Sequence, residues 1–231
     1  MRVLITGGCN DINFEVAKRI SLYNKVYIGI YKEDELKTAK ERIKKYRNIK
    51  IIKLDVTNYK DLRKIKRYEF DKVVLNSSIY ITGSILDIPI EKIKECYEVN
   101  VFGMVNVIKS VIKNMYNNDY GRIVIISSLM GLVPKKFMGI YGSTKSSLNN
   151  LSIALKKELK LISKNIKISL IETGFNTIKK ESKIFRFIEK HNLNLIVNKI
   201  EDAIMSDKPK FIYRVSFLQA LFKKIEILLF Y

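Results

Sequence analysis

The sequence has few of the residues that build covalent frameworks or metal sites. Its 231 residues include 2 cysteines and 1 histidine. Cys9 and Cys96 are too few for a disulfide framework, and neither stands near a second Cys or His at metal-ligand spacing. His191 has no evident partner and is interpreted as a surface residue. We therefore expect no metal site, a packing role for both cysteines, and a cytoplasmic location.

Long apolar runs and linkers are also missing. No run approaches the roughly 20 apolar residues that cross a bilayer, and the chain opens on a strand pattern rather than a secretion signal. There is no Pro/Gly-rich linker and no repeat, while hydrophobic residues make up 47% of the chain. That content excludes a disordered chain and predicts a single domain over residues 1–231.

Acidic residues are outnumbered. Lys+Arg total 43 against 23 Asp+Glu, which gives a net charge of +20. Such a charge suits an anionic partner, but the lysines are spread over nearly every predicted helix and form no basic stripe interleaved with aromatic residues. We therefore expect no nucleic-acid partner.

Apolar runs and helical patterns alternate along the chain. Runs typical of buried parallel strands lie at 2–5, 26–30, 49–54, 72–75, 122–128 and 166–171. Helical patterns lie at 13–22, 34–45, 59–66, 91–115 and 141–160. This order predicts an α/β fold, a Rossmann-like doubly wound parallel sheet with helices on both faces. The helix at 91–115 is apolar on more than one face, which favours a homodimer or homotetramer.

The first predicted strand runs into Thr6-Gly7-Gly8 and then into a helix, the layout of a dinucleotide phosphate turn. Asp11 and Asn13 stand where such turns usually have their later glycines. We expect the Asp11 charge to oppose a ligand's phosphates. Asn and Asp tolerate left-handed backbone, so the turn is predicted to work in a weakened form.

Three side chains farther along suit proton transfer. Tyr141 and Lys145 are four residues apart on one predicted helix, and Ser128 ends the strand before it. A tyrosine pKa of about 10 is too high for easy exchange at neutral pH, and a nearby ammonium lowers it. Taken alone, a Tyr-x-x-x-Lys pair is common and favours a structural interpretation.

The ordered motifs resemble the short-chain dehydrogenase/reductase family over residues 3–177. They are Thr6-Gly7, Leu54-Asp55-Val56, Leu75-Asn76-Ser77-Ser78, Asn100 to Gly103, the strand ending at Ser128, and Tyr141 with Lys145. The resemblance implies an oxidoreductase with a catalytic tetrad of Asn100, Ser128, Tyr141 and Lys145. Tyr141 would be the general acid or base, Lys145 would lower its pKa and hold the nicotinamide ribose, Ser128 would orient the carbonyl, and Asn100 would fix a relay water.

The resemblance also implies the cofactor contacts. These are Gly7, Cys9, Asn10, Ile12, Tyr31, Lys32, Asp55, Val56, Asn76, Gly174 and Thr177, together with Tyr141 and Lys145. The chain departs from the family at Leu75 to Ser78, which lacks the first Asn and the Gly of NNAG, and at Thr173, which replaces a proline. Thr177 also comes one residue early. All these departures are expected to touch the cofactor and none the tetrad.

The end of the second predicted strand bears on cofactor choice. It reads Ile30-Tyr31-Lys32, with no acidic residue until Glu33. An acidic residue there would bind the ribose of NAD, whereas Lys32 can meet a 2′-phosphate. The prediction is therefore NADP(H) over NAD(H), with a solvated Lys32 as the alternative.

The sequence gives little information about the substrate. The family resemblance implies that residues 129–140 and 178–188 rim the pocket. Phe137, Met138, Phe175, Phe185 and Phe187 would give it an apolar lining, with core or lid packing as the alternative. We predict hydride transfer to or from a small or medium carbonyl or alcohol. One alternative is a binding or regulatory protein of the same fold; another is a peripheral membrane protein using an apolar helical stripe within residues 215–231. For that stripe, a core or subunit contact is favoured.

Overall fold

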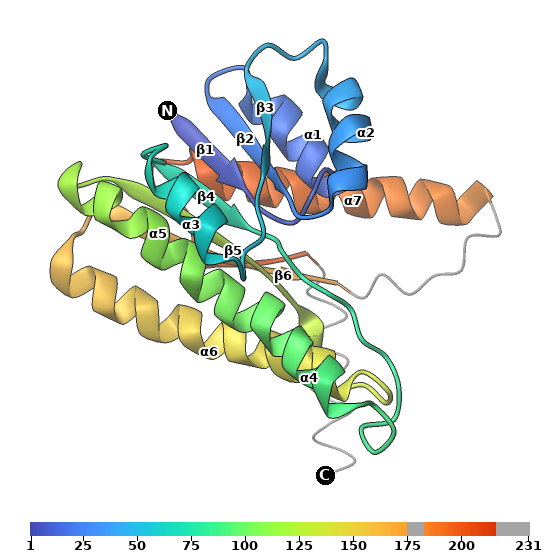
Figure 1. The fold of residues 1–231 in the computed structure, drawn as a ribbon. Coiled ribbons are helices and arrows are strands. Elements are labelled where there is room, and N and C mark those ends of the chain that lie inside the picture. The colour runs from blue at the N-terminus through green and yellow to red at the C-terminus, as the bar shows by residue number, and fades with distance from the viewer. Residues whose placement is uncertain (175–182, 216–231) are drawn as a thin grey trace.

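The chain builds one parallel sheet. The computed structural model describes residues 1–174 and 183–215, with residues 183–191 described by their backbone alone. Within these ranges the sheet has 7 strands in the order β3-β2-β1-β4-β5-β6-β7, and every neighbouring pair is parallel (Figure 1). The strands are β1 (Arg2–Ile5), β2 (Lys25–Ile30), β3 (Ile49–Lys53), β4 (Lys72–Leu75), β5 (Gly121–Ser128), β6 (Ile166–Thr173) and β7 (Ile212–Arg214).

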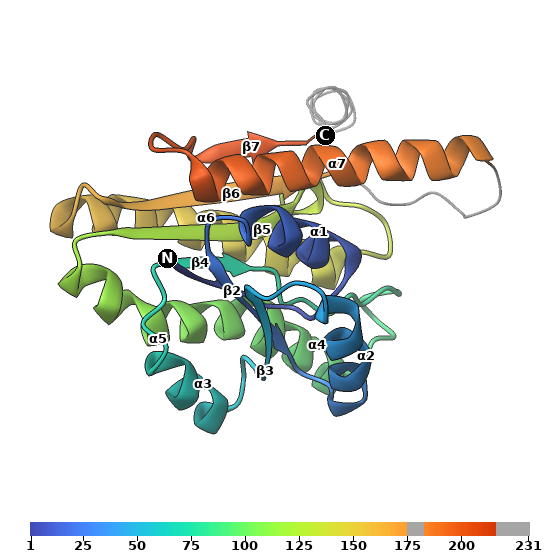
Figure 2. The same ribbon diagram turned by 90° about the horizontal axis from the view of Figure 1, so that it is seen from above.

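Helices cover both faces of this sheet (Figure 2). One face carries α1 (Asp11–Ile20), α2 (Glu33–Ile43) and α7 (Lys183–Met205), whose buried side chains form one apolar cluster. The other carries α3 (Tyr59–Lys66), α5 (Gly103–Asn117) and α6 (Gly139–Ile162), which share the second cluster, with α4 (Ile90–Tyr97) leading into α5. The predicted doubly wound α/β fold is confirmed.

Strand β1 shows why the sheet must be covered on both sides. Val3 and Ile5 point into the cluster with α1 and α7, while Leu4 points into the cluster with α5 and α6. All three are fully buried. Successive residues of a strand face opposite ways, so a continuous apolar run requires helices on both faces. At about 25 cal/mol per Å² of buried apolar area, these runs supply much of the driving force for folding.

The strand order places a crevice beside β1. The chain winds outward from β1 to β2 and β3, then returns to β4 on the other side of β1. In open parallel sheets the crevice at such a switch point lies at the carboxyl ends of the strands. Here those ends are followed by Thr6, Tyr31, Asn76 and, two residues after β3, Asp55.

The helix predicted at 91–115 is not a continuous α-helix. It divides into α4, a π-helical segment at Glu98–Phe102, and α5. A π-helical turn holds one more residue than an α-helical turn and shifts the apolar stripe around the axis. This shift helps to explain why the segment reads as apolar on more than one face.

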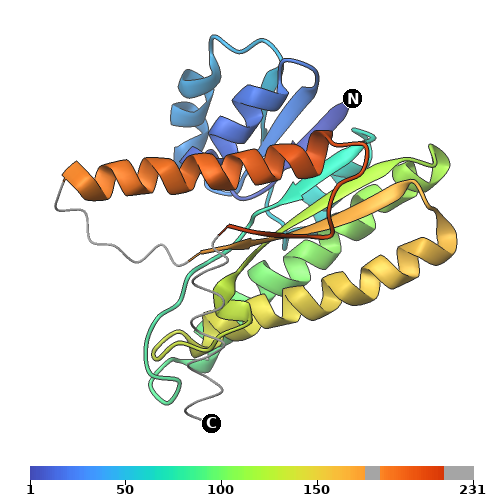
Figure 3. The ribbon, with the colours of Figure 1, turned by 180° about the vertical axis from the view of Figure 1, so that it is seen from behind.

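The last helix and strand have no counterpart in the sequence prediction. Residues 183–188, expected to rim the pocket, begin α7, and Phe185 and Phe187 are among the residues described by backbone alone. Helix α7 crosses the face of the sheet (Figure 3), and β7 extends the sheet beyond β6. The apolar stripe within residues 215–231 lies almost wholly outside the described residues. In the part of the chain that is described, no helix combines the length and apolarity needed to span a bilayer.

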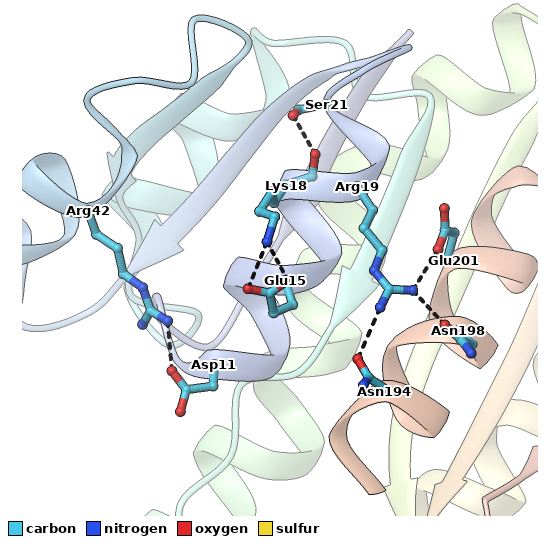
Figure 4. Close-up of polar contacts among 9 residues, drawn as sticks. All are labelled: Asp11, Glu15, Lys18, Arg19, Ser21, Arg42, Asn194, Asn198 and Glu201. Atoms are coloured by element: carbon cyan, nitrogen blue, oxygen red, sulfur yellow. Dashed lines mark hydrogen bonds and ion pairs between the residues drawn. The ribbon is translucent and has the colours of Figure 1, made fainter. Parts of the chain in front are cut away.

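Polar contacts hold α7 against α1. The Arg19 guanidinium donates to Asn198 Oδ1 at 2.5 Å and to Asn194 Oδ1 and Glu201 Oε2 at 3.2 Å each (Figure 4). Below these contacts the side chains of Ile196, Val197 and Ile200 are buried in the cluster that covers β1. Helix α7 is therefore part of the core that supports the crevice.

We predict that Ile200→Ala lowers the free energy of unfolding by about 2–4 kcal/mol, because it leaves a cavity at a fully buried position. Urea unfolding followed by circular dichroism measures the change. The control is Leu161→Ala on α6, which is 88% exposed and should change stability by less than about 0.5 kcal/mol. Equal effects of the two variants would contradict a core role for α7.

Candidate active site

A cavity of about 670 Å³ opens at the carboxyl ends of the strands, at the switch point beside β1. Its lining comes from the turn after β1, the loop after β2, the segment after β3, the loop after β4, and α4 with the π-helical segment. The lining residues are Gly7, Gly8, Gly29, Tyr31, Lys32, Glu35, Leu54, Asp55, Val56, Thr57, Ser77, Ser78, Ile79, Glu95, Glu98 and Val99. Five of the predicted cofactor contacts are thus brought together: Gly7, Tyr31, Lys32, Asp55 and Val56.

Gly7 allows the turn to pass close to the neighbouring strand. It has φ +96°, a conformation that favours glycine, and an added Cβ would lie 2.4 Å from the Asn76 carbonyl oxygen. Thr6 Oγ1 accepts from the backbone N–H groups of Asn76 and Ser77. The turn after β1 and the loop after β4 therefore form one wall of the cavity.

Asn13 takes the place of the third glycine and ties this wall together. Its side chain is buried and its Nδ2 donates to the carbonyl oxygens of Thr6 at 3.1 Å and Gly8 at 2.7 Å. Its Oδ1 accepts from Asn76 Nδ2 at 2.8 Å. The substitution thus replaces close backbone packing by a hydrogen-bonded amide. The Asn76 side chain is thus hydrogen-bonded within the protein. The next residues, Ser77 and Ser78, line the cavity.

The charge of Asp11 is paired within the protein. Asp11 Oδ1 lies 2.7 Å from Arg42 Nη2 of α2 (Figure 4), and the same guanidinium donates to the Cys9 carbonyl oxygen at 3.0 Å. The guanidinium carbon also lies 4.1 Å from the centroid of the Phe14 ring. The negative charge that we expected to oppose a ligand's phosphates therefore has Arg42 as an ion-pair partner.

The start of α1 faces the same region. Asn10 caps the helix, with its side chain accepting from Asn13 N. Because the first N–H groups of a helix have no acceptor within it, those of Asp11 and Ile12 are suited to an anion. A second cavity of about 560 Å³ is lined by Cys9, Asn10, Thr38 and Arg42, and shares Gly7, Gly8 and Glu35 with the first. Ile12 is half-buried against the apolar cluster and is not among the residues that line either cavity, so its cofactor contact stays a prediction.

The segments after β2 and β3 line the far end of the first cavity. Lys32 caps α2 without a side-chain hydrogen bond, and its Nζ lies 3.7 Å from Glu35 Oε1. Asp55 Oδ1 accepts from the backbone N–H and the hydroxyl of Thr57, which holds the turn after β3. Lys32 thus lines the cavity as predicted, with a carboxylate beside it that the sequence analysis had not considered.

Close packing brings the end of β5 against α6. Ser128 is buried at the end of the strand, and its Oγ accepts from Met130 N. An added Cβ on Gly131 would lie 2.7 Å from the Lys145 carbonyl carbon, and one on Gly142 would lie 3.0 Å from the Met130 carbonyl oxygen. Without side chains at these two positions, the segment that follows Ser128 rests directly on the turn of α6 that carries Tyr141 and Lys145.

Tyr141 and Lys145 are close, but the expected lowering of the tyrosine pKa is not found. Lys145 Nζ lies 5.3 Å from the centroid of the Tyr141 ring and donates to the Ile126 carbonyl oxygen at 3.3 Å. Burial raises the pKa of Tyr141 to about 12, against a smaller lowering by a hydrogen bond with Ser78. Burial lowers the pKa of Lys145 to about 8, a shift that nearby Cys96 opposes. The loss of hydration on burial therefore decides the direction of both pKa shifts, rather than the interaction between Tyr141 and Lys145.

A second expectation, that the change at Ser78 affects only the cofactor side, is wrong. Ser78 stands where the family has the glycine of NNAG, a departure assigned above to the cofactor side alone. Its side chain acts on Tyr141 by lowering the tyrosine pKa, and the residue also lines the cavity. The departure therefore reaches the predicted tetrad. The Tyr80 ring packs on the Tyr141 ring with centroids 4.7 Å apart.

Asn100 lies in the π-helical segment and joins three parts of the site. Its Oδ1 accepts from Ile79 N at 2.8 Å, while its Nδ2 lies 3.0 Å from the Ile79 carbonyl oxygen and 3.1 Å from Thr144 Oγ1. Cys96 Sγ is a further neighbour at 3.4 Å. Asn100 thus links the loop after β4 to α6, next to Lys145. Cys96 is fully buried here, as a packing role predicts.

The substrate side is described only in part. Gly174 follows β6, while Thr177 and Phe175 lie outside the described residues. Met138 is buried, whereas Phe137 is 54% exposed. Among the residues described, no group of three or more His, Cys, Asp or Glu side chains is arranged to hold a metal ion.

The sequence analysis missed several cavity residues. Glu35, Glu95 and Glu98 come from helices, and Ser77 and Ser78 were considered only as departures from a motif. The signal for Glu35 was available: it follows Lys32 by three residues in the first turn of a predicted helix, a spacing that brings side chains together.

Comparisons with known proteins point to one family. The family model described as short chain dehydrogenase matches residues 1–185. A probable short-chain type dehydrogenase/reductase, VdlC of Helicobacter pylori, is 37% identical over 103 residues, covering 44% of this chain and 37% of that protein. The 3-ketodihydrosphingosine reductase of Bacteroides thetaiotaomicron is 24% identical over 226 residues, covering 95% and 74%. The matches to the first four relatives span 33–46% of those proteins' lengths.

Solved structures show the same fold. A short chain dehydrogenase/reductase from Burkholderia phymatum in complex with NAD has a TM-score of 0.82 at 15% identity, covering 99% of this chain and 94% of the other. ElxO with NADP bound has a TM-score of 0.79 at 23% identity, covering 93% and 96%.

We predict that Asn13→Ala lowers the free energy of unfolding by about 2–3 kcal/mol, because the carbonyl oxygens of Thr6 and Gly8 and the amide of Asn76 lose their partner. Urea unfolding measures this. Asn150→Ala on the exposed face of α6 is the control, with less than about 0.5 kcal/mol expected. If Asn13→Ala is as stable as the control, Asn13 does not secure the turn.

A second prediction concerns Lys145. Its pKa is lowered to about 8, so below pH 8 the folded protein carries the full cost of a buried ammonium. Between about pH 8 and the unfolded value near 10.4, the folded state releases this proton first and stability rises. Without nucleotide, Lys145→Met should therefore be more stable than wild type at pH 7, and this advantage should shrink by about 2 kcal/mol at pH 9.5.

Urea unfolding of both proteins at the two pH values measures the difference. The control is Lys157→Met, on the exposed side of α6, for which the difference should not depend on pH. An advantage of Lys145→Met that stays constant with pH would contradict the lowered pKa.

Proposed function

This chain belongs to the short-chain dehydrogenase/reductase family of oxidoreductases, and on that premise we propose that it transfers hydride between a nicotinamide dinucleotide and a carbonyl or alcohol. The observation that carries the proposal is the double contact of Ser78. It lines the cavity beside the glycine turn, and its side chain lowers the pKa of Tyr141. The predicted proton donor and the cavity for the dinucleotide therefore meet at one residue.

The cavity walls suit a dinucleotide. The Gly7-Gly8 turn and the first N–H groups of α1 would hold the pyrophosphate. Asp55 and Val56 would contact the adenine, and Lys145 with Tyr141 would hold the nicotinamide ribose. Once bound, the dinucleotide supplies or accepts the hydride. Proteins of this fold have been solved with NADP and with NAD, which supports a nicotinamide cofactor without deciding between the two.

The protein's own part is to deliver a proton. With its pKa raised to about 12, Tyr141 is a protonated phenol at neutral pH and would act as the acid in carbonyl reduction once its developing phenolate is stabilised. Lys145, with its pKa lowered to about 8, is still an ammonium at pH 7 and would stabilise the developing phenolate. Ser128 would donate a hydrogen bond from its hydroxyl to the substrate oxygen. Asn100 would hold in place the turn of α6 that carries Tyr141 and Lys145.

The alternatives have less support. A binding protein of the same fold would follow if the altered turn no longer held a nucleotide, but Asn13 rebuilds the turn and Arg42 pairs with Asp11. The stripe within residues 215–231, on which the membrane alternative depends, lies almost wholly outside the described residues. A small or medium carbonyl substrate and a cytoplasmic location remain predictions.

A homodimer or homotetramer is also part of the proposal. Phe102, at the end of the π-helical segment, is 51% exposed, and Leu151 and Ile153 on α6 are 38% and 41% exposed. Apolar side chains on the outer surface of α5 and α6 would be covered by a second subunit.

Tyr141→Phe should reduce turnover by about 10²-fold or more while nucleotide affinity stays within about twofold, because only the proton donor is removed. Calorimetric titration with NADH and NADPH measures affinity, and nucleotide absorbance with a panel of aldehydes and ketones measures turnover.

The matched control for this variant is Tyr23→Phe, at a residue that is 76% exposed and precedes β2 at the amino ends of the strands, and it should leave both quantities unchanged. Turnover retained by Tyr141→Phe would exclude Tyr141 as the acid. A wild-type protein that binds neither nucleotide at millimolar concentration would favour the binding-protein alternative.

A further inference from the structure

The charge inside the main cavity is opposite to that of the chain. Among the described residues, the lining includes four carboxylates, Glu35, Asp55, Glu95 and Glu98, and one ammonium, Lys32. The whole chain carries a net charge of +20. An additional phosphate group on a ligand would thus enter a negative environment despite the basic character of the protein.

Glu35 is the carboxylate placed closest to the glycine turn. It lies in the first turn of α2, and its Oε2 is 3.5 Å from the position that a Cβ on Gly8 would occupy. It lines both the 670 Å³ cavity and the adjoining 560 Å³ cavity, where Gly7 and Gly8 are the other residues in common. Its side chain is half-exposed, so a ligand in either cavity can reach it.

The same carboxylate restricts Lys32. Glu35 Oε1 lies 3.7 Å from Lys32 Nζ, so the cation that the sequence offered to a 2′-phosphate already has a negative partner. Arg42 borders the second cavity, but its guanidinium is bound to Asp11 and the Cys9 carbonyl. Neither basic side chain is an uncommitted phosphate ligand.

We propose that Glu35 sets the cofactor preference of this chain, accepting hydrogen bonds from the adenosine ribose hydroxyls of NAD(H) and disfavouring the 2′-phosphate of NADP(H). This rests on the proposed function. A carboxylate accepts two donors from a ribose diol, whereas beside a phosphate it adds charge repulsion. The acidic residue missing at the end of β2 is supplied instead from the first turn of α2, and the NADP(H) preference inferred from Lys32 is reversed.

The test compares two variants that change the same charge on the same helical turn. Glu35→Gln removes the proposed ribose acceptor. Glu33→Gln is the control, because the Glu33 carboxylate is 84% exposed and lies near Lys53 rather than in either cavity. Calorimetric titration of the full-length wild type and of both variants gives dissociation constants for NADH and NADPH, and thermal melting verifies that all three are folded.

We expect the wild type to bind NADH at least about tenfold more tightly than NADPH, a difference of about 1.4 kcal/mol. Glu35→Gln should reduce this ratio by about tenfold, with weaker NADH binding and tighter NADPH binding, while Glu33→Gln keeps the wild-type ratio. A wild type that prefers NADPH overturns the proposal, as does an equal effect of both variants or an unchanged ratio in Glu35→Gln. Binding of neither nucleotide by the wild type overturns the proposed function itself, and the Glu35 assignment with it.

Discussion

The parallel direction of the strands is the constraint on which the rest of this structure depends. Because every neighbouring pair in the sheet is parallel, each described strand delivers its following residue to the same edge. Thr6, Tyr31, Asn76 and Ser128 are far apart in the chain and are gathered there without any direct attraction among them. The helices on both faces supply the buried area that keeps the strands aligned. The cavity is the space left where the winding changes direction beside β1.

Much of the fold was predictable because the strands are continuous apolar runs and the helices have a clear period. The bounds of β4 and α3 agree with the sequence prediction to the residue. The π-helical segment was not predictable, since its extra residue is set by packing around Asn100 rather than by local propensity. Helix α7 has apolar residues all along its length and few turn signals before it, and the three-residue β7 is too short to show a pattern.

The same distinction between local pattern and long-range packing applies to the candidate site. Residues that belong to ordered motifs, such as Gly7, Asp55 and Lys32, were identified and line the cavity. Contacts between distant segments were not identified: Ser78 with Tyr141, Asn13 with Asn76, Arg42 with Asp11. A motif records which residues follow one another, but it does not record what faces a residue from another strand. The direction of the Tyr141 pKa was wrong for this reason, because it depends on burial, which only the packed structure determines.

The π-helical segment makes the geometry of the candidate site depend on how the helix at 90–117 is wound. A π-helical turn is easily exchanged for an α-helical one by a slip of one residue, which rotates everything beyond it by about 100°. Asn100 is bound to Ile79 on one side and Thr144 on the other, so a slip would break both contacts at once. The Asn100 side chain therefore stabilises the π-helical turn. A one-residue deletion in α4 would therefore change the orientation of α5 relative to the sheet more than it changes the length of the helix.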